Sequence, residues 1–285
     1  LSLSLSLSLS QKNMPAPNLP RSPPGYNIRD ATAADAEDIT REWYASFNQS
    51  HPFFDAATPD DEPTRRWLNE AWRMGIRAGP AVLRTFVVED LAQDRRIVAF
   101  MRSHMPQIDG SQDIPLPELP AGWDEEAVDA LWGGIARSRA KCMGNRVHMS
   151  EFPPSLSPFL LLLLRLLSSL LFSALLDSLL FFSLTYLLVK MLTSRQVGEF
   201  MGVEKEHRGK QIAAKLVEWI CDVADYMGLE TYFDATRDGL PIYKKWFDFV
   251  EIAPINMPTR PETYGTYEMV AMVRAPKESA LKSRL

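Results

Sequence analysis

The stretch 199–235 constrains the fold of this chain most strongly, because strand and helix patterns follow one another closely in it. Residues 199–203 have the apolar and aromatic character of a strand, and 230–235 have it again. Between them, 209–227 places apolar residues at three-to-four spacing, which is typical of an amphipathic helix. This order of elements predicts an α/β domain. The apolar stripe of the helix consists of Ile212, Leu216, Trp219, Ile220 and Val223.

Similar patterns run through most of 26–275. Two β-branched and aromatic runs on either side of 90–95 favour a hairpin there. A helix pattern at 125–143 follows the proline-rich loop 106–124. The patterns predict one α/β domain with hairpins at both ends. The expected strands are 26–29, 84–89, 96–102, 145–149, 249–252 and 267–273, and the other expected helices are 33–47, 60–78 and 240–247.

The composition excludes several classes of protein. Lys plus Arg total 31 against 36 Asp plus Glu, so the net charge of −5 gives no basis for binding nucleic acid through counterion release. Two cysteines and four histidines are scattered without CxxC or HExxH spacing, so we expect no metal site. So few cysteines also exclude a disulfide scaffold and favour a reducing compartment, which predicts a cytoplasmic protein.

The first 25 residues do not have the composition of a folded domain. Residues 1–10 repeat Leu-Ser, and Met14 opens a proline-rich stretch that cannot form a core. We interpret Met14 as the natural start of the chain. Residues 1–13 have neither the basic start nor the apolar run of a secretory signal.

A second unusual segment, 151–198, is dominated by leucine. Within 156–189, 17 of 34 residues are Leu. A helix over 159–189 would be long enough to cross a bilayer, which takes about 20 apolar residues. Arg165 and Asp177 interrupt the run, and each would cost roughly 3 kcal/mol at the centre of a membrane helix.

Two interpretations of 151–198 stay open, a membrane helix and a translated intron. Leu, Ser, Phe and Pro are the residues that pyrimidine-rich intron codons would encode. Removing 151–198 would join 145–149 to 199–203 in one strand of ordinary length. We therefore favour the interpretation that this segment is an insert outside the working fold.

The run FMGVEKEHRGKQIAAKL at 200–216 resembles the GNAT superfamily of N-acetyltransferases, which has the signature Arg/Gln-x-x-Gly-x-Gly/Ala between its fourth strand and the next helix. The signature falls on Arg208, Gln211 and Ala213, and Gln211 stands where the family usually has glycine. A helix N-terminus offers free amides and a positive dipole end to a pyrophosphate, and small residues let it approach.

A second motif, ATRDGLPIYKKWFDF at 235–249, resembles the family's segment after its fifth strand. Tyr243 takes the position of the family tyrosine, and Asp248 replaces a usual glycine. The proline-rich loop and the long helix at 125–143 resemble the fungal members. The resemblance implies a mixed, mostly antiparallel central sheet flanked by helices, here interrupted by the leucine-rich insert.

The resemblance also implies a reaction, the transfer of an acetyl group from acetyl-CoA, as cosubstrate, to a primary amine of a small molecule or a protein. Tyr243 would protonate the leaving thiolate, and Glu199, Glu204 and His207 are candidate bases. A bulge would splay the fourth strand, so that its backbone holds the pantetheine arm and the Val203 amide stabilises the oxyanion. The residues implied in coenzyme binding are Met201, Gly202, Val203, Arg208, Gly209, Lys210, Gln211, Ile212, Ala213 and Ala214.

Two other functions remain open at this stage. One is a non-catalytic acyl-CoA-binding module, if Gln211 or the insert has spoiled the active site. The other is a membrane-anchored protein, if 159–189 spans a bilayer.

The expected organisation is an N-terminal segment (1–25), two halves of the acetyltransferase domain (26–150 and 199–275) with the coenzyme site in the second, the insert (151–198) and a tail (276–285).

Overall fold

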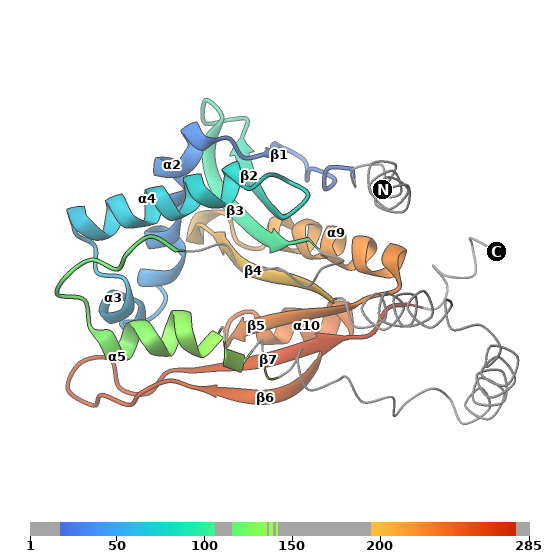
Figure 1. Cartoon of the computed structure of the whole chain (residues 1–285). Helices are drawn as coiled ribbons and strands as arrows, with labels where there is room; N and C mark the ends of the chain where they lie inside the picture. Colours follow the sequence, from blue (N-terminus) through green and yellow to red (C-terminus); the bar gives the residue numbers. More distant parts are fainter. Residues whose placement is uncertain (1–17, 106–115, 136, 139–140, 142–194, 278–285) are drawn as a thin grey trace, which may run out of the picture.

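The computed structural model describes residues 18–105, 116–135, 137–138, 141 and 195–277. In this part of the chain, seven strands form one sheet in the order β1-β2-β3-β4-β5-β7-β6 (Figure 1). Neighbouring strands are antiparallel except β4 and β5, which are parallel. The predicted mixed, mostly antiparallel sheet is therefore confirmed. The strands are β1 (Tyr26–Asp30), β2 (Leu83–Asp90), β3 (Arg96–His104), β4 (Arg195–Val203), β5 (Glu230–Thr236), β6 (Val250–Asn256) and β7 (Glu268–Arg274).

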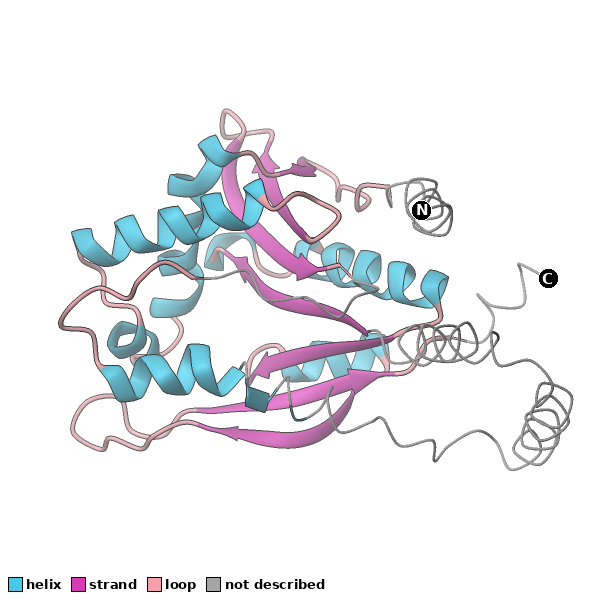
Figure 2. Cartoon of the chain, in the orientation of Figure 1, coloured by secondary structure: helices cyan, strands magenta, loops and turns pink. Residues whose placement is uncertain are grey.

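Helices cover both faces of this sheet (Figure 2). The segments α2 to α5 pack on one face, and α9 and α10 pack on the other. Two short 3₁₀ turns and two π-helical turns extend or connect them. The helical segments are η1 (Ala33–Asp35), α2 (Ala36–Trp43), η2 (Tyr44–Asn48), α3 (Phe53–Ala57), α4 (Glu62–Arg77), α5 (Glu125–Val128), η3 (Asp129–Gly133), η4 (Lys205–His207), α9 (Ile212–Met227) and α10 (Leu240–Phe247).

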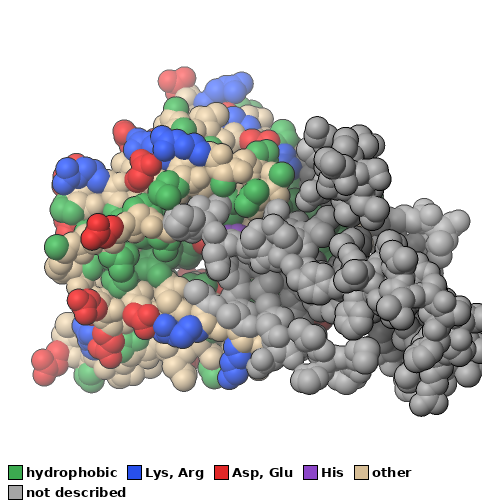
Figure 3. Space-filling model, viewed as in Figure 1, with side chains coloured by type: hydrophobic (Ala, Val, Ile, Leu, Met, Phe, Trp, Pro, Cys, Tyr) green, Lys and Arg blue, Asp and Glu red, His purple; other side chains and the backbone are tan. Residues whose placement is uncertain are grey.

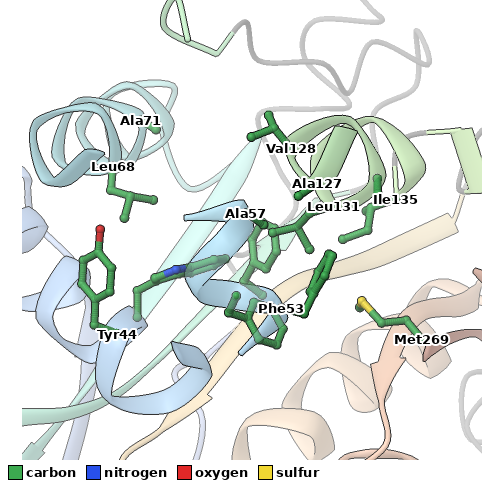
Figure 4. Close-up of a cluster of buried hydrophobic side chains, with 14 of the residues drawn as sticks. Tyr44, Phe53, Ala57, Leu68, Ala71, Ala127, Val128, Leu131, Ile135 and Met269 are labelled. Atoms are coloured by element: carbon green, nitrogen blue, oxygen red, sulfur yellow. The ribbon is translucent and has the colours of Figure 1, made fainter. Parts of the chain in front are cut away.

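The core under α2 and α4 consists mainly of aromatic rings. Trp43 and Phe53 are fully buried, and Trp72 is nearly so. In Figure 4, Phe53 of α3, Leu131 of η3 and Met269 of β7 lie together although they are far apart in the sequence. Truncating a buried aromatic side chain costs about 3–5 kcal/mol of stability, so this cluster holds the helices of this face on the sheet.

The apolar stripe of α9 packs on the opposite face, as predicted. Ile212, Leu216 and Ile220 are buried in one cluster with Phe86 of β2. Cys221 lies in the same cluster, and burial raises the pKa of its thiol to about 12. Cys221 is therefore a packing side chain.

The start of β4 differs from the prediction. The strand begins at Arg195, inside the segment 151–198, and its first residues pair with β5 from Glu230 onwards. Gly198 pairs with Ser103 of β3. The insert as predicted is thus too long at its C-terminal end, because sheet pairing extends into residues that were grouped with the leucine-rich run.

The expected helix 209–227 begins later, at Ile212. Gly209 and Gln211 have φ angles of +76° and +65°, in the left-handed region that an α-helix does not contain. The expected helix 33–47 is present as η1, α2 and η2. α3 was not predicted, because a helix of five residues is too short to show a period.

Charged side chains of both signs are spread over the described surface in Figure 3, with hydrophobic side chains in its middle. Among the described helices, none is both long and apolar enough to cross a membrane. The predictions for the segment 159–189, the strand 145–149 and residues 1–13 lie outside the described residues.

Candidate active site

The strands β4 and β5 separate at the centre of the sheet. They pair only from Arg195 to Val197 on β4 and from Glu230 to Tyr232 on β5. On its other side, β4 pairs with β3, but the register shifts so that Glu199 is an extra residue between two pairs. Such a bulge increases the local twist of a strand. The expected bulge is therefore present, and it lies where the two parallel strands diverge.

A cavity of about 780 Å³ opens at the diverging ends of these strands. This volume is within the usual range of about 300–1,000 Å³ for ligand sites. The lining combines residues after α2, the end of β4, the start of α9 and the first turns of α10. Lys210 is exposed and does not line it. Of the coenzyme residues implied by the sequence, the cavity brings together Met201, Gly202, Val203, Arg208, Gly209, Gln211, Ile212, Ala213 and Ala214, with Tyr243 opposite.

The backbone of β4 presents free groups to this cavity. The Glu204 amide donates a hydrogen bond to the Val98 carbonyl of the neighbouring strand β3 at 3.1 Å. In an antiparallel ladder, hydrogen-bonded and non-hydrogen-bonded pairs of residues alternate. Val203 and Met201 are in non-hydrogen-bonded pairs with β3, so their backbone amides and carbonyls point away from it. The Val203 carbonyl accordingly accepts from the Arg208 Nε at 3.2 Å.

The first turn of α9 forms a second group of free donors. Gln211 is the N-cap residue, and its side chain makes no capping hydrogen bond. The amides of Ile212, Ala213 and Ala214 precede the first intrahelical bond, which the Lys215 amide donates to the Gln211 carbonyl at 3.0 Å. Unpaired amides and the positive end of the helix dipole together favour an anion.

Arg208 carries positive charge to the same place. Its guanidinium donates to the Val203 carbonyl and to the Ser46 carbonyl, each at 3.2 Å. A carboxylate oxygen of Asp238 lies 3.7 Å from the guanidinium. Since the Arg208 side chain is 43% exposed, it can exchange the Asp238 contact for a ligand.

Gly202 lets η2 approach β4 closely. A Cβ atom at this position would lie 2.7 Å from the Phe100 ring and 2.8 Å from the Ser46 Oγ. Ser46 belongs to the π-helical turn η2, and its hydroxyl is buried without a hydrogen-bond partner in the described structure. The sequence did not indicate Ser46, because only the tertiary contact with β4 places it at the cavity.

Tyr243 lies on α10 beside the gap between β4 and β5. Its ring packs against Phe233 and Phe249 at centroid distances of 5.1 and 5.8 Å. Gly239 lies directly under the ring, since a Cβ there would lie 2.8 Å from it. Burial raises the pKa of Tyr243 to about 12, so the phenol stays protonated at neutral pH. Among the described residues, none forms a hydrogen bond with this hydroxyl.

Glu199 lines a smaller chamber of about 70 Å³ that shares Phe47, Met201 and Tyr243 with the main cavity. Its carboxylate accepts a hydrogen bond from the Arg102 Nε at 2.7 Å and lies 3.3 Å from the His104 Nε2.

Burial raises the pKa of Glu199, but the charge of Arg102 and the adjacent His104 ring, whose Nε2 is 3.3 Å away, outweigh it. The pKa is therefore held well below its usual value, and the side chain stays ionised.

The other two candidate bases are held in ion pairs and hydrogen bonds. Glu204 makes a two-point ion pair with Arg96 at 2.7 and 2.8 Å and does not line the cavity. His207 lines the cavity but is 3% exposed. Its Nδ1 forms a hydrogen bond of 2.9 Å with the Tyr26 hydroxyl, and its Nε2 lies 3.6 Å from Glu204. Both residues therefore fix the turn between β4 and α9.

The described residues contain no group of three or more His, Cys, Asp or Glu side chains arranged to hold a metal ion. The arrangement instead offers amides and one guanidinium for an anionic ligand, two outward amides on β4, and a phenol at the gap between the strands.

Comparison with known proteins gives matches only at the level of structure. No family model and no curated protein matches the sequence. The C-terminal condensation domain of Ebony, solved with β-alanyl-dopamine, is 9% identical with a TM-score of 0.53, covering 88% of this chain and 98% of that one. A putative arylalkylamine N-acetyltransferase 7 from the mosquito Aedes aegypti is 12% identical with a TM-score of 0.51, covering 88% and 87%. An acetyltransferase from Corynebacterium glutamicum is 14% identical with a TM-score of 0.45, covering 89% and 97%. The first two of these structures, both with a TM-score above 0.5, show that the chain has a GNAT-like fold.

Proposed function

We propose that this protein is an N-acetyltransferase that moves the acetyl group of acetyl-CoA to a primary amine. One observation carries the proposal. A single cavity joins the open first turn of α9, the outward backbone of Met201 and Val203, and the hydroxyl of Tyr243. These are the groups needed to hold a pyrophosphate, to hold an amide-rich arm ending in a thioester, and to assist a leaving thiolate.

The coenzyme would lie along the diverging ends of β4 and α9. Arg208 and the amides of Ile212 to Ala214 would hold its pyrophosphate, with Gly209 and Gln211 shaping the turn. The outward groups of Met201 and the Val203 carbonyl would form strand-like hydrogen bonds with the pantetheine amides, which leaves the Val203 amide for the thioester carbonyl. Lys210 would act only through its charge, since its side chain does not line the cavity.

The Val203 amide would stabilise the oxyanion when the amine attacks the thioester carbonyl. As the C–S bond breaks, Tyr243 would donate a hydrogen bond to the departing thiolate. With a pKa of about 12, the phenol is a weaker acid than a thiol, whose pKa is about 8.5. We therefore propose that Tyr243 stabilises the thiolate through this hydrogen bond and keeps its proton, and that the thiolate takes a proton from water. The amine nitrogen loses its second proton to water.

The first proton of the ammonium group must leave before attack, because the pKa of an alkylamine is about 10.4. Of the two candidate carboxylates, Glu199 is better placed, since it lines the chamber between the strands. Its lowered pKa makes it a weak base, so we propose that it attracts the ammonium group, which then loses its first proton to water. Glu204 would support the turn through its ion pair with Arg96.

We further propose a small-molecule amine as the acceptor. The Ebony domain was solved with β-alanyl-dopamine and the mosquito protein is named for arylalkylamines, and the cavity has the size of a small-ligand site. The fungal subtype and a cytoplasmic location are part of this proposal and rest on the sequence alone.

The test combines calorimetric titration with acetyl-CoA and a thiol-release assay with a panel of primary amines. Binding together with amine-dependent release of CoA supports the proposal. Binding without release for any amine would favour the non-catalytic acyl-CoA-binding module. A protein that does not bind acetyl-CoA would contradict both.

A further inference from the structure

The cavity has a second end that the coenzyme site does not use. Ser50, His51, Thr266 and Tyr267 line it there. Tyr267 belongs to the hydrophobic cluster on the sheet face of α2 to α5, whereas α9 packs on the other face. A ligand bound beside Tyr267 would therefore lie on the opposite side of the sheet from the phosphate-binding turn.

His51 is held at this end in one tautomer. Its Nδ1 accepts a hydrogen bond from the Phe53 backbone amide at 3.1 Å. A ring nitrogen that accepts carries no proton, so the neutral ring has its proton on Nε2. Burial and the positive charge of Arg237 lower the pKa of His51, which favours this neutral form. His51 is thus a hydrogen-bond donor through Nε2.

The orientation of the ring is also fixed. His51 packs on Tyr267 with ring centroids 4.6 Å apart, and Tyr267 stacks on Phe53 at 5.0 Å. His51 is partly exposed, and within the described residues no atom accepts a hydrogen bond from its Nε2. The cavity therefore contains a pre-oriented neutral donor beside an aromatic surface.

We propose that the Nε2–H of His51 donates a hydrogen bond to an oxygen of the acceptor, and that the acceptor is a primary amine on an apolar body that carries a hydroxyl or carbonyl oxygen. The inference rests on the proposed acetyl transfer and names its acceptor class. An N–H donor cannot pair with a second ammonium group, so a diamine does not fit this end.

Matched amines test the inference. Tyramine and 2-phenylethylamine differ only in a ring hydroxyl, and 3-amino-1-propanol and butylamine differ by a hydroxyl in place of a methyl. We expect the wild-type protein to prefer the hydroxylated member of at least one pair by about 3- to 10-fold in kcat/KM, the effect of one net hydrogen bond. His51→Phe keeps a ring on Tyr267 but has no donor, and it should abolish that preference. His51→Gln restores an N–H donor and should recover part of it.

Titration with acetyl-CoA separates the possible failures. The inference requires the Kd of acetyl-CoA to be the same in all three proteins. His51→Phe also removes the acceptor of the Phe53 amide, so a somewhat lower melting temperature is expected for that variant. Suppose that acetyl-CoA binds and amines are acetylated. If the wild-type protein then prefers neither hydroxylated amine, or if His51→Phe keeps the preference, the inference is wrong and the proposed function stands. If His51→Phe weakens acetyl-CoA binding instead, His51 belongs to the coenzyme site. If acetyl-CoA does not bind at all, the proposed function and the inference both fail.

Discussion

Gly209 and Gln211 share the left-handed turn before α9, and moving glycine between these positions tests how the turn is built. Gln211 has φ +65° and ψ +5°, a conformation that costs a residue with a Cβ about 1–2 kcal/mol. Its side chain makes no capping hydrogen bond, so replacing it loses no bond at the helix start. Gln211→Gly therefore removes strain without removing a contact.

The expected size follows from two opposing effects. Relief of strain contributes about 1–2 kcal/mol, and the greater freedom of glycine in the unfolded chain costs about 0.4–1 kcal/mol. We expect Gln211→Gly to raise the free energy of unfolding by about 0.5–1 kcal/mol. For a domain of this size, that corresponds to roughly 1–4 °C in Tm.

Gly209→Ala is the matched control. Gly209 has φ +76°, and a Cβ atom there would meet nothing within 4 Å. The added methyl group therefore introduces backbone strain without a clash, and we expect a loss of about 0.5–1 kcal/mol. The two variants should change stability in opposite directions.

Urea unfolding of each variant gives the free energies, and calorimetric titration gives the affinity for acetyl-CoA. The affinity of Gln211→Gly should be equal or better, because glycine leaves the amides of α9 uncovered. A clear loss of affinity would mean that Gln211 itself contacts the coenzyme. A destabilised Gln211→Gly, or a Gly209→Ala that unfolds like the wild-type protein, would refute the account of strain in this turn.

Three further predictions concern other parts of the molecule. Arg208→Ala should weaken acetyl-CoA binding by about 10-fold or more, from the loss of one charge-assisted contact; unchanged affinity in a titration would place the phosphate site elsewhere. Tyr243→Phe should lower turnover by about 10²-fold or more with little change in coenzyme affinity, because the departing thiolate loses a hydrogen-bond donor; unchanged turnover, with chemistry rate-limiting, would make Tyr243 a packing residue. Deletion of 151–194 should give a folded protein that binds acetyl-CoA. Deletion of 151–198 also removes residues of β4 that pair with β5, and it should lower the Tm. If the protein lacking 151–194 does not fold, the deleted segment is required for the structure.

The sequence by itself determined the elements whose patterns are local. The apolar stripe of α9 predicted which face of the helix is buried, because apolar residues spaced three to four apart all lie on one side of a helix. The hairpin of β2 and β3 followed from two β-branched runs around a polar turn. Arg208 and Tyr243 were found through motifs of a few residues, and the structure places both at one cavity.

Only the tertiary structure decided features that depend on partners far away in the chain. The start of β4 at Arg195 depends on pairing with β3 and β5, and composition does not report pairing. Glu199 became the bulge residue through the register with β3, and this register turned it toward Arg102. His51 has no sequence signal, since its tautomer and orientation come from the Phe53 amide and the Tyr267 ring.

The physical reason is the range of the forces involved. Helix and strand patterns reflect burial along one short segment, which neighbouring residues encode. Bulges, outward backbone groups and fixed tautomers arise when strands and loops distant in the sequence form hydrogen bonds with one another, so they exist only in the folded chain.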